Sequence, residues 1–323
     1  MTSSNRKKVI MDMDPGVDDA LAIIMAIHSP ELEVLAITTV AGNVGIDHCV
    51  KNTLRVLALL DLENPPIVAR GAEKALKAKP HDAASVHGED GLGALGDAYY
   101  PELNWDLVTD EPAADLMARL VAEHPGEVTV MADGPITNVA EAIRRHPKEM
   151  AKAKAIQAMT GAIHVPGNIP PVGAAEFDAY CDPDALAEVL DFTVPVFMVP
   201  LDVTHAVPLQ RDIAQYEFGR RTDRISKFVL DSSVHYMDFY RDDQGHDGCY
   251  LHDPLNVAIA AFPTIARTEA MRIHVDTSDS LTRGLTLPYH HPRLKKAEPN
   301  CHVALKVDTE RTMRLFWERV RGD

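Results

Sequence analysis

Four aspartates near the N-terminus are the residues whose type and spacing indicate chemistry most directly. Asp12 and Asp14 follow a short apolar run, a Pro-Gly turn comes next, and Asp18 and Asp19 follow the turn. Carboxylates that converge at one point repel one another, and burying them is costly unless a positive charge lies between them. Oxygen ligands favour a hard cation such as Ca²⁺ or Mg²⁺, and no Cys or His lies nearby to favour Zn²⁺. The cluster therefore predicts a site for a hard cation.

Two other interpretations fit parts of this cluster. An N-cap followed by a solvated acidic turn explains Asp18 and Asp19, which begin a predicted helix whose dipole favours anions. It explains Asp12 and Asp14 poorly, because an apolar strand leads directly into them. A phosphotransferase of the haloacid-dehalogenase type also opens with a strand and DxD. That pattern continues with Thr or Val two residues later, where this chain has Gly16, and the pair of acids after the turn is foreign to it.

The elements that must position these acids alternate along the chain between short apolar runs and helical stretches. Strands are predicted at residues 9–11, 34–40, 66–68, 128–132, 155–159 and 194–199, and helices at residues 18–28, 48–60 and 137–145. This alternation predicts an α/β fold in one domain, residues 1–323, with an open, Rossmann-like, mostly parallel sheet flanked by helices. Ligands of such sheets bind outside the carboxyl ends of the strands, which is where Asp14 stands.

The composition restricts the class of protein. With 323 residues, of which 46% are hydrophobic, the chain can bury a large core. Its net charge of −16 repels phosphate backbones, so a nucleic-acid polymer is not expected as a partner. No apolar run approaches membrane-spanning length, so no membrane is expected either. The cysteines form neither a CxxC motif nor a disulfide framework, which favours the reducing cytoplasm: Cys49, Cys181, Cys249 and Cys301.

The segment DMDPGVDDA, residues 12–20, resembles the DxDPGxDDA signature of the inosine-uridine preferring nucleoside hydrolases. That family hydrolyses the N-glycosidic bond of ribonucleosides to free base and ribose, with one bound Ca²⁺ and a single-domain α/β fold. The resemblance therefore implies the nucleoside hydrolase fold, Ca²⁺ as cofactor, a small-molecule nucleoside as substrate, and a homodimer or homotetramer. Further family-like segments follow across nearly the whole chain: AGN at residues 41–43, HGEDGLG at 87–93, GPITNVA at 134–140, GN at 167–168 with AAEFD at 174–178, DPDA at 182–185 and LHDPLNVA at 251–258.

The resemblance also implies roles for single residues. Asp14 is expected to bind the metal and to act as general base on the metal-bound water. Asp19 and Asp253 are expected to complete the carboxylate ligands, and Asp133 to contribute its backbone carbonyl. His252 is expected near the leaving base. The residues expected to contact the substrate, most of them through the ribose hydroxyls, are Asp18, Asn43, His87, Met159, Asn168, Glu176 and Asp178.

The implied chemistry suits these residue types. Breaking a glycosidic bond builds an oxocarbenium ion, which anionic groups around the sugar stabilise. The base leaves as an anion unless an acid protonates it, which suits His252. Without the resemblance, His252 would be an ordinary histidine at a helix start, His87 a loop histidine and Asn43 a turn former. A nucleoside-binding protein without catalysis is a further alternative, against which Asp14 and the pair His252 and Asp253 argue.

Three positions depart from the family pattern. Asp178 stands where the family has Asn, and because an ionised Asp only accepts hydrogen bonds, we expect hydrolysis with a changed substrate preference. Asp133 precedes Gly134, and a carbonyl ligand does not depend on its side chain, so metal binding is expected to persist. A further carboxylate here is expected to alter the metal preference. Thr160 follows Met159 where relatives often have Gly, and it is expected to narrow the space near the sugar.

Irregular segments complete the prediction. Residues 77–105 are rich in Gly, Pro, Asp and His and are predicted to form a long functional loop. Residues 91–96 fit GxGxxG, but they follow no strand and open no helix, so no dinucleotide is expected. A second irregular insertion is predicted at residues 283–300. Residues 235–250, HYMDFYRDDQGHDGCY, are either part of the base pocket or an ordinary amphipathic helix with its loop, and purine and pyrimidine bases both remain open.

Overall fold

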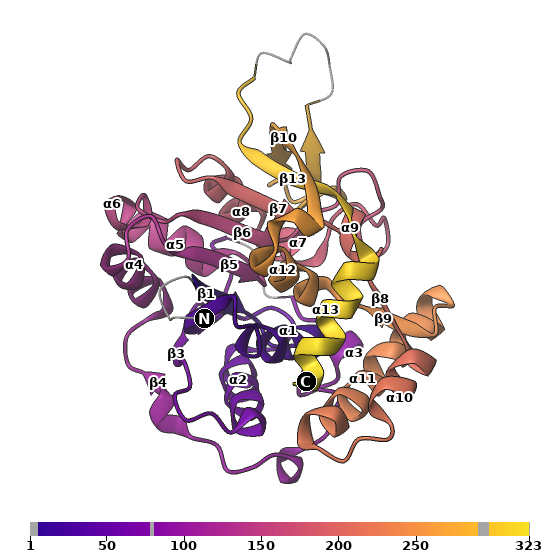
Figure 1. Cartoon of the computed structure of the whole chain (residues 1–323). Helices are drawn as coiled ribbons and strands as arrows, with labels where there is room; N and C mark the ends of the chain where they lie inside the picture. The colour runs from indigo at the N-terminus through magenta and orange to yellow at the C-terminus, as the bar shows by residue number, and fades with distance from the viewer. Residues whose placement is uncertain (1–5, 78–80, 290–296, 323) are drawn as a thin grey trace.

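A nine-stranded sheet forms the centre of the structure, a computed structural model that describes residues 6–77, 81–289 and 297–322 (Figure 1). Its strands are β1 (Lys7–Met13), β2 (Leu32–Thr39), β3 (Ile67–Arg70), β4 (Val108–Thr109), β5 (Thr129–Asp133), β6 (Ala155–Met159), β7 (Val196–Val199), β10 (Ala266–Met271) and β13 (Cys301–Val307). The order across the sheet is β10-β13-β7-β6-β5-β1-β2-β3-β4. All neighbours are parallel except the edge pair β10 and β13. The predicted mostly parallel α/β sheet is therefore confirmed.

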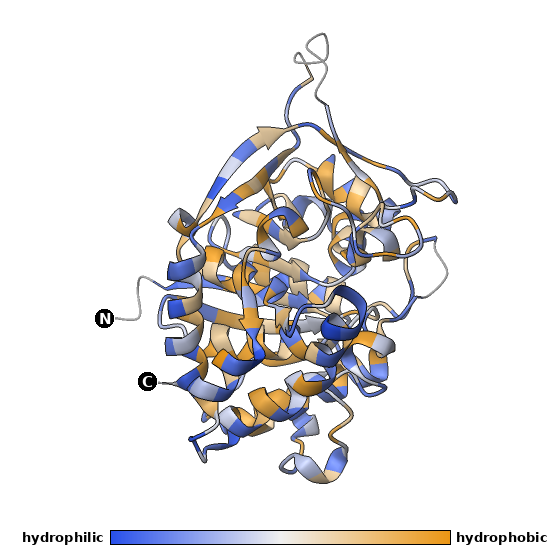
Figure 2. Ribbon diagram, turned by 90° about the vertical axis from the view of Figure 1, so that its right-hand side faces the viewer, coloured by the Kyte–Doolittle hydropathy of each residue, from blue (hydrophilic) through white to orange (hydrophobic). Residues whose placement is uncertain are grey.

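Helices cover both faces of this sheet and form two apolar cores with it, which appear as orange ribbon in the interior of Figure 2. One core is built with α1 (Val17–Ile27), α2 (Ile46–Leu60), α11 (Arg224–Gln244), α12 (His252–Ala261) and α13 (Thr309–Arg321). The other is built with α4 (Ala113–Glu123), α5 (Thr137–Arg145), α6 (Pro147–Met150) and α8 (Pro183–Leu190). The helices α1 and α12 contact each other and are buried along nearly their whole length, which explains their apolar composition on all sides.

Short elements connect these layers. Two small antiparallel sheets pair β8 (Pro208–Gln210) with β9 (Gly248–Tyr250), and β11 (Ile273–Val275) with β12 (Thr286–Pro288). The remaining helices are α3 (Ala84–His87), α7 (Phe177–Cys181), α9 (Leu201–Thr204) and α10 (Arg211–Phe218).

The central strand β1 determines where the acids lie. The chain runs from β1 to β2, β3 and β4 on one side and returns to β5 on the other, so the topological switch point lies between β1 and β5. Successive side chains of a strand face opposite layers. Met11 and Met13 belong to one core and Ile10 to the other. Asp12 therefore shares the face of Ile10, whereas Asp14 lies beyond the strand at the switch point.

The predicted elements match the observed ones closely where the chain is apolar, since the predicted strand 155–159 and helix 137–145 are β6 and α5. The strand β10 was not predicted because it is an edge strand whose side chains are mostly exposed, so it lacks an apolar run. The insertion predicted at residues 283–300 is partly wrong, because β12 lies within it. Its residues 290–296 lie outside the described part of the chain.

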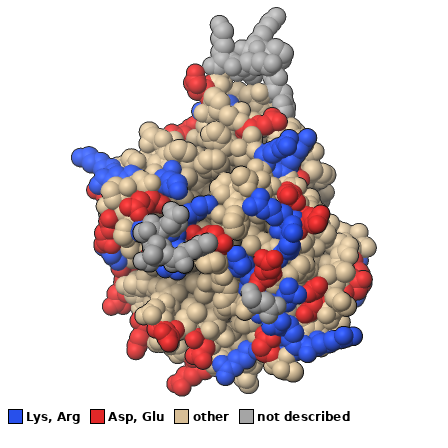
Figure 3. Space-filling model, in the orientation of Figure 1, with Lys and Arg blue, Asp and Glu red and all other residues tan. Residues whose placement is uncertain are grey.

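The helices and the surface charge bear on which partners the protein can bind. Among the described residues, every helix falls short of the length and apolar character that crossing a bilayer requires. Figure 3 shows basic side chains interspersed with acidic ones on the visible face, including the region where α13 lies in Figure 1.

The four cysteines are buried free thiols.

Candidate active site

The turn between β1 and α1 buries all four aspartates of the cluster. Asp12, Asp14, Asp18 and Asp19 are at most 4% exposed. The interpretation as a solvated acidic turn is therefore wrong. Asp12 does not line the cavity described below, because its carboxylate accepts hydrogen bonds from Thr38 Oγ1 at 2.6 Å and from Asn138 Nδ2 of α5 at 2.7 Å, toward the other core.

Asp14 occupies a cradle that two glycines make possible. A Cβ atom on Gly42 would lie 2.0 Å from Asp14 Oδ2, and one on Gly134 would lie 2.6 Å from Asp14 Oδ1. The backbone N–H of Asn43 donates to Asp14 Oδ2 at 2.6 Å. The loop after β2 and the residue after β5 thus close around this carboxylate, which explains why the AGN and GPITNVA segments each carry a glycine there.

The carboxylate of Asp19 forms hydrogen bonds with the backbone of the turn between β1 and α1. Its carboxylate accepts hydrogen bonds from the backbone N–H of Gly16 at 2.9 Å and of Asp14 at 3.3 Å, which fixes the start of α1. Asn43 Nδ2 also donates to it at 3.1 Å. Asn43 is therefore more than a turn former, because its backbone contacts one aspartate and its side chain another.

Three carboxylates converge among the described residues, since ligand atoms of Asp18, Asp19 and Asp253 lie within 4.8 Å of one another. Asp253 comes from the first turn of α12, more than two hundred residues from the cluster. Asp14 is not in this group, although the resemblance assigns it to the metal and Asp18 to the sugar. Asp14 Oδ2 instead accepts the hydrogen bond from the backbone N–H of Asn43.

The donor chemistry fits the Ca²⁺ ion that the resemblance implies. The converging ligands are carboxylate oxygens from two helix N-termini, which suits a hard divalent cation. Asp133 ends β5, and its Oδ2 is buried without a hydrogen-bond partner, while Asn256 Nδ2 donates to its Oδ1 at 2.7 Å. A buried carboxylate oxygen without a partner is costly, and a nearby cation removes that cost.

The titration properties of these acids reflect the same crowding. Burial, followed by the charges of Asp19 and Asp178, raises the pKa of Asp14 well above its usual value. Burial and neighbouring carboxylates likewise raise the pKa values of Asp18 and Asp253. Burial raises the pKa of Asp19 to about 6, against the opposing effect of its backbone hydrogen bonds. The protein alone therefore disfavours the fully ionised cluster.

Asp14, Asp18 and Asp253 line one cavity of about 510 Å³ at the carboxyl ends of the central strands. All predicted site residues except Asp19 line it. Asp19 lies just below the cavity surface in contact with Asp14. The predicted residues on the walls are Asp14, Asp18, Asn43, His87, Asp133, Met159, Asn168, Glu176, Asp178, His252 and Asp253.

Glu176 has a structural use that the sequence did not reveal. Its carboxylate caps α7, accepting hydrogen bonds from the backbone N–H groups of Asp178 at 2.8 Å and Ala179 at 3.1 Å. It also accepts hydrogen bonds from Gly161 N–H and from Thr160 Oγ1, both at 3.0 Å. Thr160 does not line the cavity, so the expectation that it narrows the space near the sugar is wrong. Its hydroxyl is turned toward Glu176 instead.

His252 lines the cavity at the start of α12. Its Nδ1 lies 2.8 Å from Thr204 Oγ1, and its Nε2 lies 3.1 Å from Tyr240 OH. Burial, with His205 and His87 nearby, lowers the pKa of His252 well below its usual value, so the ring is neutral. Thr204 could not have been identified from the sequence, because it contacts His252 only through the packing of α9 against α12.

His87 is also fully embedded rather than exposed on a loop. The backbone N–H of Val17 donates to its Nδ1 at 3.2 Å. Because an N–H group can only donate, Nδ1 is unprotonated and the proton of the neutral ring is on Nε2. Burial lowers the pKa of His87 to about 3, in agreement with a neutral ring. The ring of Tyr236 stacks on it with centroids 4.8 Å apart.

One face of α11 forms much of the remaining wall. Of the two interpretations left open for residues 235–250, the cavity lining favours a part in the pocket for the helical portion, although the individual residues had not been singled out. Their spacing of three and four residues is a signal that could have identified them. The cavity-lining residues on this helix are Tyr236, Phe239, Tyr240, Asp243 and Gln244.

Known proteins resemble this chain over nearly its whole length. The family model of the "Inosine-uridine preferring nucleoside hydrolase" matches residues 9–314. A "Pyrimidine-specific ribonucleoside hydrolase RihA" from Salmonella arizonae is 38% identical over 317 residues, covering 97% of this chain and 98% of the relative. The protein of the same name from Citrobacter koseri is 37% identical over 313 residues, covering 97% of each chain.

Solved structures of similar proteins have the same fold. The structure titled "Plant nucleoside hydrolase - PpNRh1 enzyme" has a TM-score of 0.89 and 34% identity, covering 97% of this chain and 98% of the other. A "Purine-Preferring Ribonucleoside Hydrolase from Gardnerella vaginalis" has a TM-score of 0.89 and 32% identity, covering 98% of each chain. The chain therefore belongs to the inosine-uridine preferring nucleoside hydrolase family and is an N-glycosyl hydrolase.

Proposed function

We propose that the protein is a Ca²⁺-dependent ribonucleoside hydrolase that releases free base and ribose, with Asp14 as general base and His252 beside the leaving base. The observation that carries this proposal is the placement of the two residues on one cavity, with a converging group of carboxylates between helices α1 and α12. The whole-chain match to the nucleoside hydrolase family gives the phosphotransferase alternative no support.

The first step in this proposal is activation of water. Asp14, Asp19 and Asp253, with the backbone carbonyl of Asp133, would hold the Ca²⁺ ion, and Asp18 stands close enough to join them. A bound Ca²⁺ supplies Lewis-acid chemistry that lowers the pKa of a coordinated water. Asp14 then accepts the proton of the attacking water. The backbone N–H of Asn43 donates to the Asp14 carboxylate and keeps its orientation.

The second step is stabilisation of the sugar as the bond breaks. Positive charge develops on the ribose in the oxocarbenium-like transition state. Asp18, Asp178 and Glu176 are buried in the wall of the cavity and supply negative charge where the surrounding protein screens it less than bulk water does. Asn43 and Asn168 add polar groups of the kind that position hydroxyls. Met159 closes the wall with apolar surface.

The third step is departure of the base. The base takes up a proton as the bond breaks, and His252 and Tyr240 form a hydrogen-bonded pair on that wall. Burial lowers the pKa of His252 well below its usual value, so the ring is neutral and carries a single N–H proton. We therefore assign delivery of the proton to the pair: the Tyr240 hydroxyl gives its O–H proton to the base as the glycosidic bond breaks, His252 Nε2–H donates a hydrogen bond to the phenolate that remains, and water returns a proton to Tyr240 after the base has left. Thr204 keeps the ring in place.

Hydrolysis of ribonucleosides is tested by incubating the purified chain with a panel of purine and pyrimidine nucleosides and measuring reducing sugar. We expect free base and ribose to appear together, and only with Ca²⁺ present. The panel includes both base classes because one set of relatives is named pyrimidine-specific and a structural relative purine-preferring. Release of phosphate from a phosphomonoester, without base release, would support the phosphotransferase instead. Tight binding of a nucleoside without turnover would support the non-catalytic alternative.

Asp178→Asn is expected to retain hydrolysis but to change the preference between ribo- and 2′-deoxyribonucleosides about two- to tenfold, the value of one hydrogen bond. The reason is that Asp178 lines the cavity as an acceptor, whereas an amide also donates. The measurement is kcat/KM for matched ribo- and deoxyribonucleosides. Asp184→Asn, which makes the same charge change outside the cavity, is the control. Identical profiles for wild type and Asp178→Asn would contradict the role of Asp178.

Assembly as a homodimer or homotetramer and a cytoplasmic location follow from the family resemblance and from the free cysteines, respectively. Both stay predictions. Size-exclusion chromatography with light scattering decides the first of them.

A further inference from the structure

A loop that lines part of the cavity depends on side chains for its position. Residues 82–100 contribute His87 and several neighbours to the cavity wall, and they contain the one-turn helix α3 and a short 3₁₀ helix. Gly88, Gly91, Gly93 and Gly96 all have positive φ, a backbone conformation that residues with a Cβ rarely adopt. A segment of this kind has no ladder of strand hydrogen bonds, so other contacts must hold it in place.

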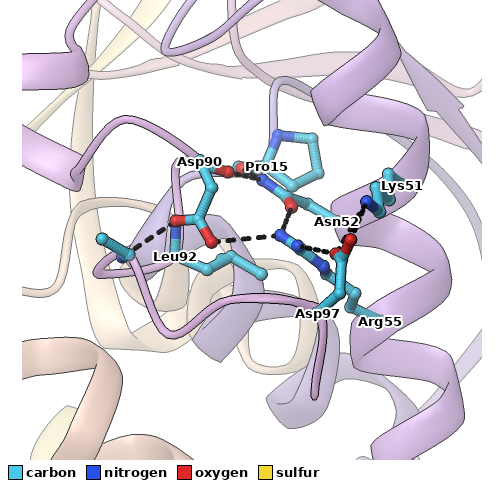
Figure 4. Close-up of polar contacts among 8 residues, drawn as sticks. Pro15, Lys51, Asn52, Arg55, Asp90, Leu92 and Asp97 are labelled. Atoms are coloured by element: carbon cyan, nitrogen blue, oxygen red, sulfur yellow. Dashed lines mark hydrogen bonds and ion pairs between the residues drawn. The ribbon is translucent and has the colours of Figure 1, made fainter. Parts of the chain in front are cut away.

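Arg55 of α2 provides the central contact on one side of this loop (Figure 4). Its side chain is 4% exposed. One guanidinium nitrogen donates to Asn52 Oδ1 at 2.8 Å and to Asp90 Oδ2 at 3.3 Å, and the other donates to Asp97 Oδ1 at 2.5 Å. The guanidinium carbon lies 4.7 Å from the centre of the Tyr100 ring. A single buried arginine therefore contacts three points along the loop.

Asn52, one turn before Arg55, extends this connection to the aspartate turn. Its Nδ2 donates to the backbone carbonyl of Pro15 at 2.9 Å and to that of Asp90 at 2.7 Å. Because Arg55 donates to the Asn52 carbonyl oxygen, the amide has a fixed orientation and its NH₂ group faces both carbonyls. Figure 4 shows the Asn52 amide facing Pro15 and Asp90, with Arg55 on its other side. The loop and the turn that carries Asp14 thus share one side chain.

Asp90 links Arg55 to the backbone of the loop. Its Oδ1 accepts hydrogen bonds from the backbone N–H groups of Leu92 at 3.0 Å and Ala94 at 2.9 Å, and its Oδ2 accepts from Arg55. Leu92 is completely buried in the core. A Cβ atom on Gly91 would lie 2.8 Å from Asn52 Nδ2, so the loop approaches α2 as closely as glycine allows.

His87 is attached to the same turn. The backbone N–H of Gly93 donates to the His87 carbonyl at 2.8 Å, and the His87 ring accepts a hydrogen bond from Val17 N–H. A displacement of the turn at Asp90 would therefore move the His87 ring away from the start of α1. The contacts of Arg55 and the position of His87 belong to one connected structure.

We propose that Arg55 is a positioning residue for the reaction: it holds the 82–100 loop against the aspartate turn, so that the His87 ring presents its Nε2–H to the substrate. The kinetic part of this inference rests on the proposed nucleoside hydrolysis. A residue that only stabilised the fold would lower the amount of folded enzyme. Arg55 instead determines the geometry of a wall that the substrate contacts, so its loss weakens substrate binding by enzyme that is folded.

The test compares Arg55→Met, Arg55→Lys and the control Lys51→Met in the full-length enzyme with Ca²⁺. Lys51 lies one turn away on α2 and also pairs with Asp97, but on the exposed side. We expect Arg55→Met to raise KM about tenfold with kcat within about twofold of wild type, and Lys51→Met to change neither. Arg55→Lys keeps the charge without the planar fork and is expected to fall between them. The proposal would be overturned if Arg55→Met lowered kcat and left KM unchanged. It would also be overturned if the variant only reduced the fraction of folded enzyme and left both kinetic constants unchanged.

A double-mutant cycle with His87→Ala tests the connection itself. If Arg55 acts through His87, adding Arg55→Met to His87→Ala changes kcat/KM by less than about twofold, because the ring is already absent. Effects that multiply would overturn the proposal.

Amide hydrogen exchange gives a readout that needs no turnover. We expect exchange in residues 83–95 to rise about tenfold or more in Arg55→Met, with strand β1 unchanged. Unchanged loop exchange would overturn the positioning role even in an enzyme with full activity. If wild type failed to hydrolyse nucleosides, the proposed function would be wrong, and the exchange result would still decide whether Arg55 holds the loop. Should Arg55→Met fail to fold, Arg55→Lys allows the same comparisons.

Discussion

Asp14→Asn is expected to lower kcat about 10²–10⁴-fold, the usual contribution of a positioned general base. This corresponds to about 3–5 kcal/mol of transition-state stabilisation. The reason is that Asn cannot accept the proton of the attacking water, while its size leaves the cradle between Gly42 and Gly134 filled. The measurement is kcat for a good nucleoside substrate at saturating Ca²⁺, with the Ca²⁺ content of each protein determined in parallel.

A buried carboxylate outside the cavity is the control for this variant. Asp182 is completely buried and caps α8 through Ala185 N–H, and it also accepts hydrogen bonds from Leu76 N–H and Thr137 Oγ1. Asp182→Asn is expected to lower thermal stability but to keep kcat near that of wild type per folded molecule. Full turnover by Asp14→Asn with its metal intact would refute the assignment of the general base.

Removal of Ca²⁺ by a chelator is expected to abolish activity and to lower thermal stability, and both are expected to return when Ca²⁺ is added. An ion at about one hundred times its Kd stabilises the folded state by about 2.7 kcal/mol. At roughly 2.1 cal/mol/K of unfolding entropy per residue, a chain of this length would change its Tm by about 4 °C. The measurements are reducing-sugar release and thermal unfolding. An unchanged rate in protein shown to be metal-free would contradict metal-assisted catalysis.

The stabilisation by Ca²⁺ is also expected to depend on pH. The raised pKa values of the buried acids determine whether it grows or shrinks as pH rises. Their pKa values are raised in the folded protein, so the folded state binds more protons than the unfolded state, and the metal-free protein loses stability as pH rises. Ca²⁺ binds the ionised form that protons oppose. The difference in Tm with and without Ca²⁺ is therefore expected to grow from about pH 5.5 to about pH 8. The buried neutral histidines contribute equally to both samples and cancel in this difference.

The resemblance of single segments to one family predicted more of the site than general sequence patterns did. The DxDPGxDDA segment identified the turn, and the later segments supplied residues such as Asp253 and His252, which line the same cavity. Helical spacing in residues 235–250 contained the information that Tyr236 and Tyr240 share a face. In contrast, no local pattern distinguishes the exposed strand β10 from a loop, because its side chains alternate only weakly in burial.

The sequence by itself determined the fold class, the family, and the presence of an acidic site at the end of the first strand. These depend on local properties: apolar runs, turn residues, and acids placed at a strand–helix junction. The tertiary structure decided where each acid lies. Asp12 turns to the far layer because strand side chains alternate, Asp19 is held beneath the turn, and Asp18 rather than Asp14 converges with Asp253. Such arrangements depend on how α1, α12 and β5 pack across distant parts of the chain.

The same distinction applies to Glu176 and Arg55. The family resemblance predicted that Glu176 contacts the ribose. Nothing in the sequence predicted a role for Arg55. Packing revealed that the Glu176 carboxylate is occupied by four donors around α7, and that Arg55 joins the His87 loop to α2. Charged groups buried in a core must satisfy their hydrogen bonds with whatever lies beside them. Those neighbours exist only once the chain has folded, so the sequence specifies the charges and the fold specifies their partners.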